Sequence, residues 1–135
     1  MKSLIISPHP DDEVLGAGGT LFKRKSSKKN NSLYWIIVTK LQSNTPKIKV
    51  LRRKNEIKKI SKLFGFKKVF QLNFNTTELD SSSKKRLIKD FSDIFKKIKP
   101  YELFVPHFSD VHSDHKIVSE VISTCTKNFR FPFIK

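Results

Sequence analysis

The sequence predicts an α/β fold in which a mainly parallel sheet carries helices on both faces. Strand-like and helix-like segments alternate along the whole chain. Right-handed crossovers leave few topologies for such an alternation, and four β–α units in succession favour a doubly wound sheet with strand order 3-2-1-4. At a length of 135 residues, a single domain spanning residues 1–135 is expected.

Four segments have the length and composition of strands. Residues 2–7 are rich in apolar side chains and are ended by two prolines, and residues 33–39 are nearly all apolar, as in a strand buried on both faces. Residues 69–72 and 101–105 are shorter runs of the same kind. All four are therefore predicted to pair in one sheet.

Four further segments have apolar residues at helical spacing, which predicts helices over residues 12–25, 49–64, 83–99 and 114–125. Gly65 and Pro100 are the expected stops of the second and third helices. The side chains predicted to pack inward are Val14, Leu15, Leu21 and Phe22; Ile57, Ile60, Leu63 and Phe64; Leu87, Phe91, Ile94, Phe95 and Ile98; and Val118, Val121, Ile122 and Cys125. Gly16, Gly18 and Gly19 in the first helix are expected to serve close packing on the sheet or close approach of the backbone to a ligand.

The composition excludes several classes of protein. A single Cys cannot form an internal disulfide or a multi-Cys zinc module. No apolar run is long enough for a signal peptide or a membrane helix, so a cytoplasmic protein is expected. The net charge of +16 comes mostly from Lys spread along the chain. This pattern favours solubility and non-specific binding to polyanions over a specific nucleic-acid partner.

Two polar clusters contain every His of the chain. His9 lies in Pro-His-Pro-Asp-Asp-Glu directly after the first predicted strand, and the other three His lie in residues 107–115, directly after the fourth. In the order 3-2-1-4 these two strands are neighbours, and the winding reverses between them. Ligands of such sheets bind at the carboxyl ends of the strands at this switch point. The sequence therefore predicts a metal site built from both clusters.

Catalytic zinc takes three protein ligands and keeps one position open for water. His9 and Asp12 would be the close pair of ligands and His115 the distant one. Asp11 is then placed to accept a proton from water, and His112 to protonate a leaving group or stabilise an oxyanion, held in its tautomer by Asp114. Taken singly, Asp11, Asp12 and Asp114 could also be plain helix caps.

Three stretches resemble the PIG-L/LmbE family of zinc-dependent amino-sugar N-deacetylases: residues 8–19 (PHPDDEVLGAGG), 53–65 (RKNEIKKISKLFG) and 107–118 (HFSDVHSDHKIV). The resemblance implies a Rossmann-like fold, Zn²⁺ on His9, Asp12 and His115, Asp11 as general base, and His112 supported by Asp114 as the acid or oxyanion-stabilising group. It also implies that Arg53 reaches toward a small-molecule or lipid-linked substrate that carries an N-acetylglucosamine-type group.

Members of this family are usually longer, with further strands after the second His-rich motif. The resemblance therefore implies that residues 1–135 are the N-terminal portion of such a domain, with later strands missing. Phe129, Phe131, Phe133 and Ile134 alternate as in a strand without a partner. We expect them to be exposed or to fold back, and to favour self-association. The alternatives to an active deacetylase are an inactive zinc-binding fragment and a basic nucleic-acid-binding domain. For His107 and Asp110, loop shaping or support of a ligand is favoured over catalysis.

Overall fold

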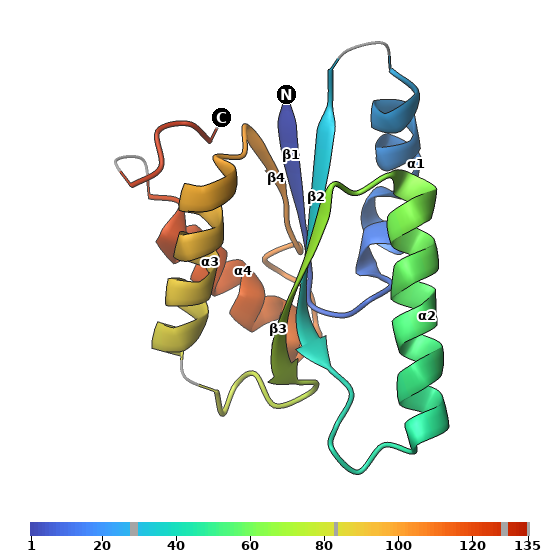
Figure 1. Ribbon diagram of the computed structural model, residues 1–135. Helices are drawn as coiled ribbons and strands as arrows, with labels where there is room; N and C mark the ends of the chain where they lie inside the picture. The colour runs from blue at the N-terminus through green and yellow to red at the C-terminus, as the bar shows by residue number, and fades with distance from the viewer. Residues whose placement is uncertain (28–29, 83, 128–129, 135) are drawn as a thin grey trace.

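The computed structural model describes residues 1–27, 30–82, 84–127 and 130–134. Strands and helices alternate in it without exception (Figure 1). The elements are β1 (Lys2–Ser7), α1 (Asp12–Ser26), β2 (Ser32–Lys40), α2 (Lys47–Phe64), β3 (Lys68–Asn75), α3 (Lys84–Ile98), β4 (Glu102–Phe104) and α4 (Ser113–Cys125). The predicted alternation is confirmed, with most element ends shifted by one or two residues.

The four strands form one parallel sheet in the order β3-β2-β1-β4. This is the predicted doubly wound order, with the switch point between β1 and β4. The pairing places Ser3 of β1 opposite Glu102 of β4 and Ser32 of β2 opposite Lys2 of β1. The carboxyl ends of β1 and β4 therefore meet at the same edge of the sheet.

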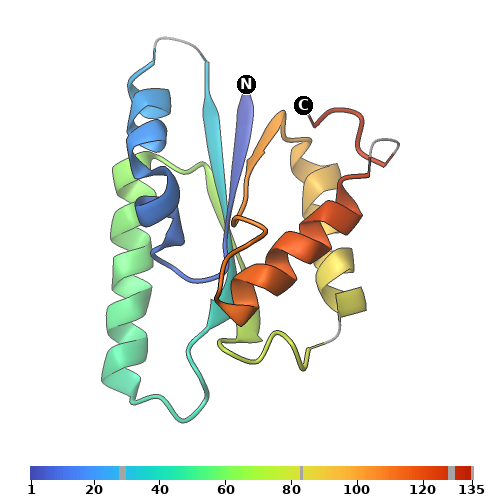
Figure 2. The same cartoon turned by 180° about the vertical axis from the view of Figure 1, so that it is seen from behind.

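Helices cover both faces of the sheet, α1 and α2 on one side and α3 and α4 on the other (Figures 1 and 2). Alternate residues of β2 contribute to two hydrophobic cores, one on each face of the sheet. Trp35 and Ile37 pack toward α1 and α2, whereas Ile36 and Val38 pack toward α3 and α4. All four are nearly inaccessible to solvent, as expected for the central strand of a two-sided parallel sheet.

Helix α1 packs differently from the prediction. Leu21 is fully buried, but Val14, Leu15 and Phe22 are exposed, Leu15 by 83% of its surface. The packed face of α1 instead consists of Leu21 with two small residues, Ala17 and Gly18. Gly18 faces the Phe64 ring of α2, and a Cβ at this position would lie 3.9 Å from the ring, an ordinary van der Waals contact.

The other helices follow the predicted pattern more closely. Every inward position expected in α3 and α4 is buried. In α2, Phe64 is buried but Leu63 is exposed, contrary to expectation. Gly65 ends α2 in a left-handed conformation (φ 71°) and donates its N–H to the Ser61 carbonyl, which confirms its role as the stop.

Strand β3 is longer than predicted and contains a bulge. Ile37 pairs with Gln71, but Thr39 pairs with Phe74, so β3 has one residue more than β2 across this interval. Asn73 lies in it with φ 61°, a left-handed conformation that Asn adopts more readily than most residues. The bulge lies at the carboxyl end of the sheet, on a wall of the pocket described below.

The end of the chain folds back onto α3 rather than extending as a strand. Phe131 is only 6% exposed and meets the Phe95 ring edge-on at 5.5 Å. Phe133 and Ile134 are partly buried against the same core, and Ile134 donates its N–H to the Phe131 carbonyl in a turn. Phe129 lies outside the described residues. Self-association through this region stays a prediction, which light scattering would check.

We expect Phe131→Ala to destabilise the protein by about 3 kcal/mol, because truncating a buried Phe leaves a cavity. The shift of the urea unfolding midpoint at constant slope measures this change. Phe108→Ala is the matched control, since that ring is 77% exposed and its loss should change stability by less than about 0.5 kcal/mol. Equal effects of the two substitutions would mean that Phe131 does not contribute to the core.

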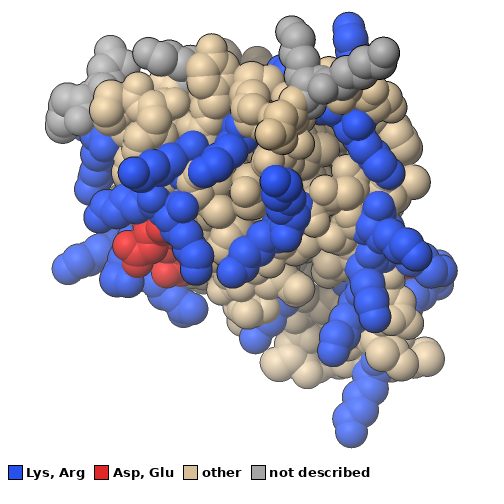
Figure 3. All heavy atoms as spheres, turned by 45° about the horizontal axis from the view of Figure 1, so that its top comes forward, with Lys and Arg blue, Asp and Glu red and all other residues tan. Residues whose placement is uncertain are grey.

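Basic side chains are widely spread over the end of the molecule at which both termini lie (Figure 3). One small acidic group lies among the basic side chains on one side of this view, and the basic side chains form no single stripe. None of the helices in the described residues is long and apolar enough to cross a membrane.

Candidate metal centre

The fold brings the two His-containing clusters together. His9 follows β1, and Asp12 begins α1 just beyond it. His112 and His115 lie at the start of α4, which follows β4. Because β1 and β4 are paired and parallel, their carboxyl ends place these residues side by side. The prediction that the two clusters meet at the switch point is confirmed.

Three donor atoms form a compact triangle at this point. Nδ1 of His9 lies 3.7 Å from Oδ2 of Asp12, Nε2 of His115 lies 3.4 Å from the same oxygen, and the two ring nitrogens are 3.3 Å apart. Ligands about 2.0–2.1 Å from a tetrahedral zinc ion are about 3.3–3.4 Å from one another. The donor set and its spacing therefore fit a divalent metal ion held by His9, Asp12 and His115.

Carboxylates on the outer side of both His rings orient them toward this triangle. Nδ1 of His115 lies 2.9 Å from Oδ2 of Asp110, and Nε2 of His9 lies 2.9 Å from Oδ2 of Asp114. When the N–H group at each of these nitrogens donates a hydrogen bond to the carboxylate, the other nitrogen of the ring presents a lone pair to the centre of the triangle. Such a partner typically fixes the tautomer of a metal-binding His.

The contacts of Asp114 differ from the expectation. Its carboxylate is fully buried and accepts hydrogen bonds from the Thr77 and Leu79 N–H groups as well as from His9. The hydrogen bond between Asp114 and His112 comes from the backbone instead: the Asp114 N–H donates to Nδ1 of His112 at 3.1 Å. Asp114 thus positions His9 through its side chain and His112 through its backbone.

A second group of donors, His9, His112 and Asp114, also lies close together. It suits a metal ion less well, because the Asp114 oxygens already accept two backbone N–H groups and Nδ1 of His112 accepts a third. A metal ion there would have to replace these hydrogen bonds in a buried setting. The triangle of His9, Asp12 and His115 is therefore the better candidate.

His112 is placed to donate a proton beside the triangle. Its ring centroid lies 4.6 Å from that of His9. Because Nδ1 accepts the Asp114 N–H, the neutral ring carries its proton on Nε2. This tautomer supplies the N–H donor that an oxyanion-stabilising group needs, whereas donation of a proton to a leaving group requires the imidazolium form.

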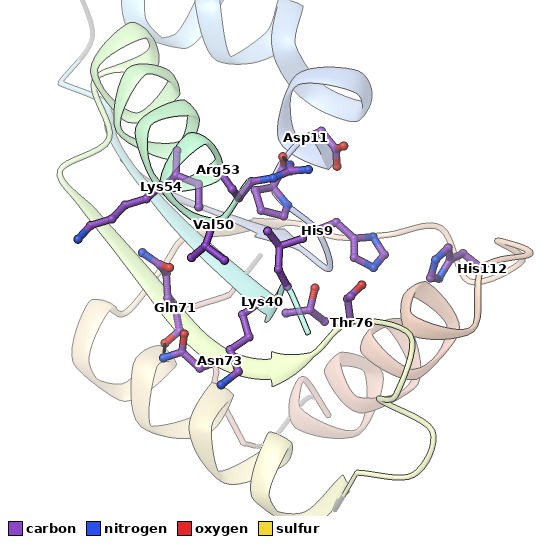
Figure 4. A pocket seen from close by; sticks show the side chains of 14 residues that line it. His9, Asp11, Lys40, Val50, Arg53, Lys54, Gln71, Asn73, Thr76 and His112 are labelled. Carbon is purple, nitrogen blue, oxygen red and sulfur yellow. Dashed lines mark hydrogen bonds between the residues drawn. The ribbon is translucent and has the colours of Figure 1, made fainter. Parts of the chain in front are cut away.

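A pocket of about 510 Å³ opens next to His9 and His112 (Figure 4). Asp11 is exposed on its rim, and Arg53 of α2 contributes to the same wall. The Arg53 guanidinium donates to the Pro10 carbonyl at 2.6 Å and lies 3.6 Å from the Glu56 carboxylate. Arg53 therefore joins α2 to the first motif while lining the pocket, and its role toward a substrate stays a prediction.

A buried acid, Glu13, follows Asp12 in the first turn of α1 and was not predicted as part of the site. The Trp35 indole N–H donates to the Ser7 hydroxyl at 2.9 Å, and the hydroxyl donates to Glu13 at 3.3 Å. Burial raises the pKa of Glu13 to about 7. In the sequence Glu13 is indistinguishable from an ordinary acid in the first turn of a helix. The chain of hydrogen bonds fixes that turn, and with it Asp12, to β1 and β2.

Asp110 is expected to contribute to metal affinity through His115. The backbone N–H of His112 holds the pKa of Asp110 below its ordinary value, so the carboxylate is ionised at neutral pH. We expect Asp110→Ala to weaken zinc binding by about 10–100-fold, measured by competition with a chromophoric chelator. Asp93→Ala is the control, since Asp93 pairs with Lys89 on α3. An affinity unchanged by Asp110→Ala would show that the His115 ring needs no such partner.

The fold and the site together define a doubly wound α/β protein with a candidate mononuclear metal centre at its switch point. Comparison with known proteins is consistent with this class. The profile of the PIG-L family, described as GlcNAc-PI de-N-acetylase, matches residues 4–126. The chain therefore belongs to the PIG-L family.

Two deacetylases are similar to this chain in sequence or in structure. The chain is 30% identical over 124 residues to a diacetylchitobiose deacetylase of Thermococcus kodakarensis, covering 85% of this chain and 45% of that protein. Among solved structures it is similar to the N,N′-diacetylchitobiose deacetylase of Pyrococcus horikoshii in complex with its inhibitor MPG. The TM-score is 0.78 at 28% identity, over 97% of this chain and 51% of that one. The chain thus spans about half the length of these relatives.

A third comparison shows the fold alone. The 4-carboxy-2-hydroxymuconate hydratase GalB of Pseudomonas putida aligns with a TM-score of 0.73 at 18% identity, over 96% of this chain and 59% of that one. Since a hydratase has this fold too, the fold does not define the reaction, and function depends on the residues of the site.

Proposed function

We propose that this chain carries the metal-binding and proton-transfer residues of a hydrolase that removes the acetyl group from an N-acetylated amino sugar. The triangle of donor atoms on His9, Asp12 and His115, beside an open pocket, is the observation that carries the proposal. Two imidazoles and one carboxylate with a free position are typical of catalytic zinc. Membership of the PIG-L family and the similarity to diacetylchitobiose deacetylases support the substrate class.

A zinc ion on these three residues would supply Lewis-acid polarisation of the acetamide carbonyl. The Asp11 carboxylate then takes a proton from the attacking water, since Asp11 lines the pocket and is not part of the donor triangle. His112 stabilises the developing oxyanion through its Nε2–H group or, once protonated to the imidazolium, donates a proton to the departing amine. Arg53 orients the sugar from the α2 wall. The water adds across the C–N bond, giving free amine and acetate.

The test combines metal analysis with an assay of amine release. Purified chain is analysed for bound metal, stripped with a chelator, and assayed on diacetylchitobiose and other N-acetylglucosamine conjugates before and after zinc is restored. We expect about one zinc per chain and amine release that depends on it. Zinc binding without amine release would favour an inactive metal-binding chain. Turnover of the substrate without release of acetate would favour another reaction on this fold.

A further inference from the structure

The buried Asp114 carboxylate joins three parts of the fold. Asp114 lies in the first turn of α4, and its Oδ2 is 2.9 Å from Nε2 of His9, which follows β1. The carboxylate also accepts the backbone N–H groups of Thr77 and Leu79, at 2.8 and 3.3 Å, from the loop between β3 and α3. Figures 1 and 2 show this loop running beside the start of α4. The loop supplies no corner of the donor triangle, yet it contacts the group that orients one of the candidate ligands.

Thr77 has a backbone conformation that its residue type disfavours. Its φ is 62°, in the left-handed region, where a β-branched residue is a genuine outlier. Such residues persist only where the surrounding structure holds them, and they cluster at functional sites. The Thr77 N–H donates to Oδ2 of Asp114, the same oxygen that faces His9. The strained residue thus directs its backbone donor at the contact between Asp114 and a candidate metal ligand.

Both ends of this short stretch are anchored. The Thr76 N–H donates to the Lys40 carbonyl of β2 at 3.0 Å, and the Thr77 hydroxyl donates to the Thr76 carbonyl at 2.7 Å. The Leu79 side chain is inaccessible to solvent and belongs to the core that the sheet forms with α3 and α4. Because the sheet and the core fix the loop on either side of Thr77, its two N–H donors are preorganised for the Asp114 carboxylate.

We propose that Thr77 is a positioning residue of the metal centre and acts through its backbone. Its N–H, together with that of Leu79, fixes the Asp114 carboxylate so that Oδ2 accepts the Nε2–H group of His9. His9 is thereby held in the tautomer whose Nδ1 lone pair faces the donor triangle. The inference rests on the metal site of the proposed function. It adds to that site a residue outside the three stretches that resemble the family.

The direct test removes this N–H group and keeps the side chain. Incorporation of the α-hydroxy analogue of threonine at residue 77 replaces the amide by an ester of nearly the same shape. We expect zinc affinity, measured by competition with a chromophoric chelator, to fall by about tenfold, the lower end of what partners of metal-binding His typically contribute. In the metal-free protein, nitrogen NMR of the imidazole rings reports the tautomer of His9. The proton should lie on Nε2 in the unaltered chain and be shared between both nitrogens in the ester.

Two controls separate this N–H from the rest of the loop. The same ester at Ser82 removes an N–H that donates to the Leu79 carbonyl, and it should leave zinc affinity unchanged. Thr77→Gly removes the side chain but keeps the N–H, and Gly adopts a positive φ without steric cost. Its zinc affinity and His9 tautomer should therefore match those of the unaltered chain. A loss in Thr77→Gly as large as that in the ester would assign the effect to the side chain and overturn the proposal.

Failure of this inference differs from failure of the proposed function. An unchanged His9 tautomer in the Thr77 ester would overturn the inference even if zinc affinity fell, because a general loosening of the loop would then explain the loss. A chain that binds no zinc with Thr77 unaltered would refute the metal site, yet the tautomer in the metal-free protein would still test the Thr77 N–H. Conversely, loss of affinity together with the tautomer change supports the inference even if no amine is released.

Discussion

Replacing His115 by Ala is expected to abolish stable zinc binding and with it all zinc-dependent turnover. Nε2 of His115 lies 3.3 Å from the His9 nitrogen and 3.4 Å from the Asp12 oxygen, so its loss removes one corner of the donor triangle. Zinc sites in small folds are worth about 10–16 kcal/mol over three or four ligands. One ligand then accounts for about 3–4 kcal/mol, or on the order of 10²–10³-fold in affinity.

His107→Ala provides the control for this experiment. His107 is exposed, and its ring nitrogen interacts with Ser109 rather than with the triangle. Zinc content by elemental analysis and affinity by chelator competition should therefore match those of the unaltered chain. Retention of full zinc affinity in His115→Ala would refute the assigned ligand set, and the group of His9, His112 and Asp114 would have to be reconsidered.

Asp11→Asn is expected to leave zinc bound while lowering turnover by roughly 10²–10⁴-fold, the usual contribution of general acid–base catalysis. The reason is that Asp11 lines the pocket, whereas the neighbouring Asp12 supplies the metal-facing oxygen. Asn has nearly the same size, so the loop should keep its shape. Amine release at saturating zinc, together with zinc content, is the measurement.

The comparison variant for Asp11→Asn is Asp12→Asn, which alters the adjacent carboxylate by the same chemical change. It should lower zinc affinity, because its Oδ2 is a corner of the triangle. If Asp11→Asn loses the metal and Asp12→Asn keeps it, the two roles have to be exchanged.

Much of the fold could be predicted because its elements are separated by clear breaks in hydrophobic pattern. Helices α3 and α4 show this best, since each buries its whole apolar stripe. The packing of helix α1 was predicted only in part: Leu21 and Gly18 are buried as expected, but Val14, Leu15 and Phe22 are exposed. The small residues Ala17 and Gly18 lie on the packed face in their place. A count of large apolar residues cannot reveal this kind of contact.

The candidate ligands could be predicted from residue type and strand order, but their supporting contacts could not. The hydrogen bond between His9 and Asp114 joins residues 105 positions apart. The Asp114 carboxylate also accepts backbone N–H groups of the loop after β3, whose position depends on the tertiary fold. The left-handed Asn73 arises from a register shift between β2 and β3. Neither feature leaves a local pattern in the sequence.

The separation of His9 and His115 by 106 positions has a consequence for biosynthesis. A growing chain that has exposed only its first motif offers two donors of the triangle, and the third follows only after β1 to β4 have been translated. Tight metal capture would thus wait for β4 and would report that β1 and β4 are already paired. Metal bound to the folded chain would lock α1 and α4 together, adding about 2.7 kcal/mol of stability when free zinc exceeds its dissociation constant a hundredfold.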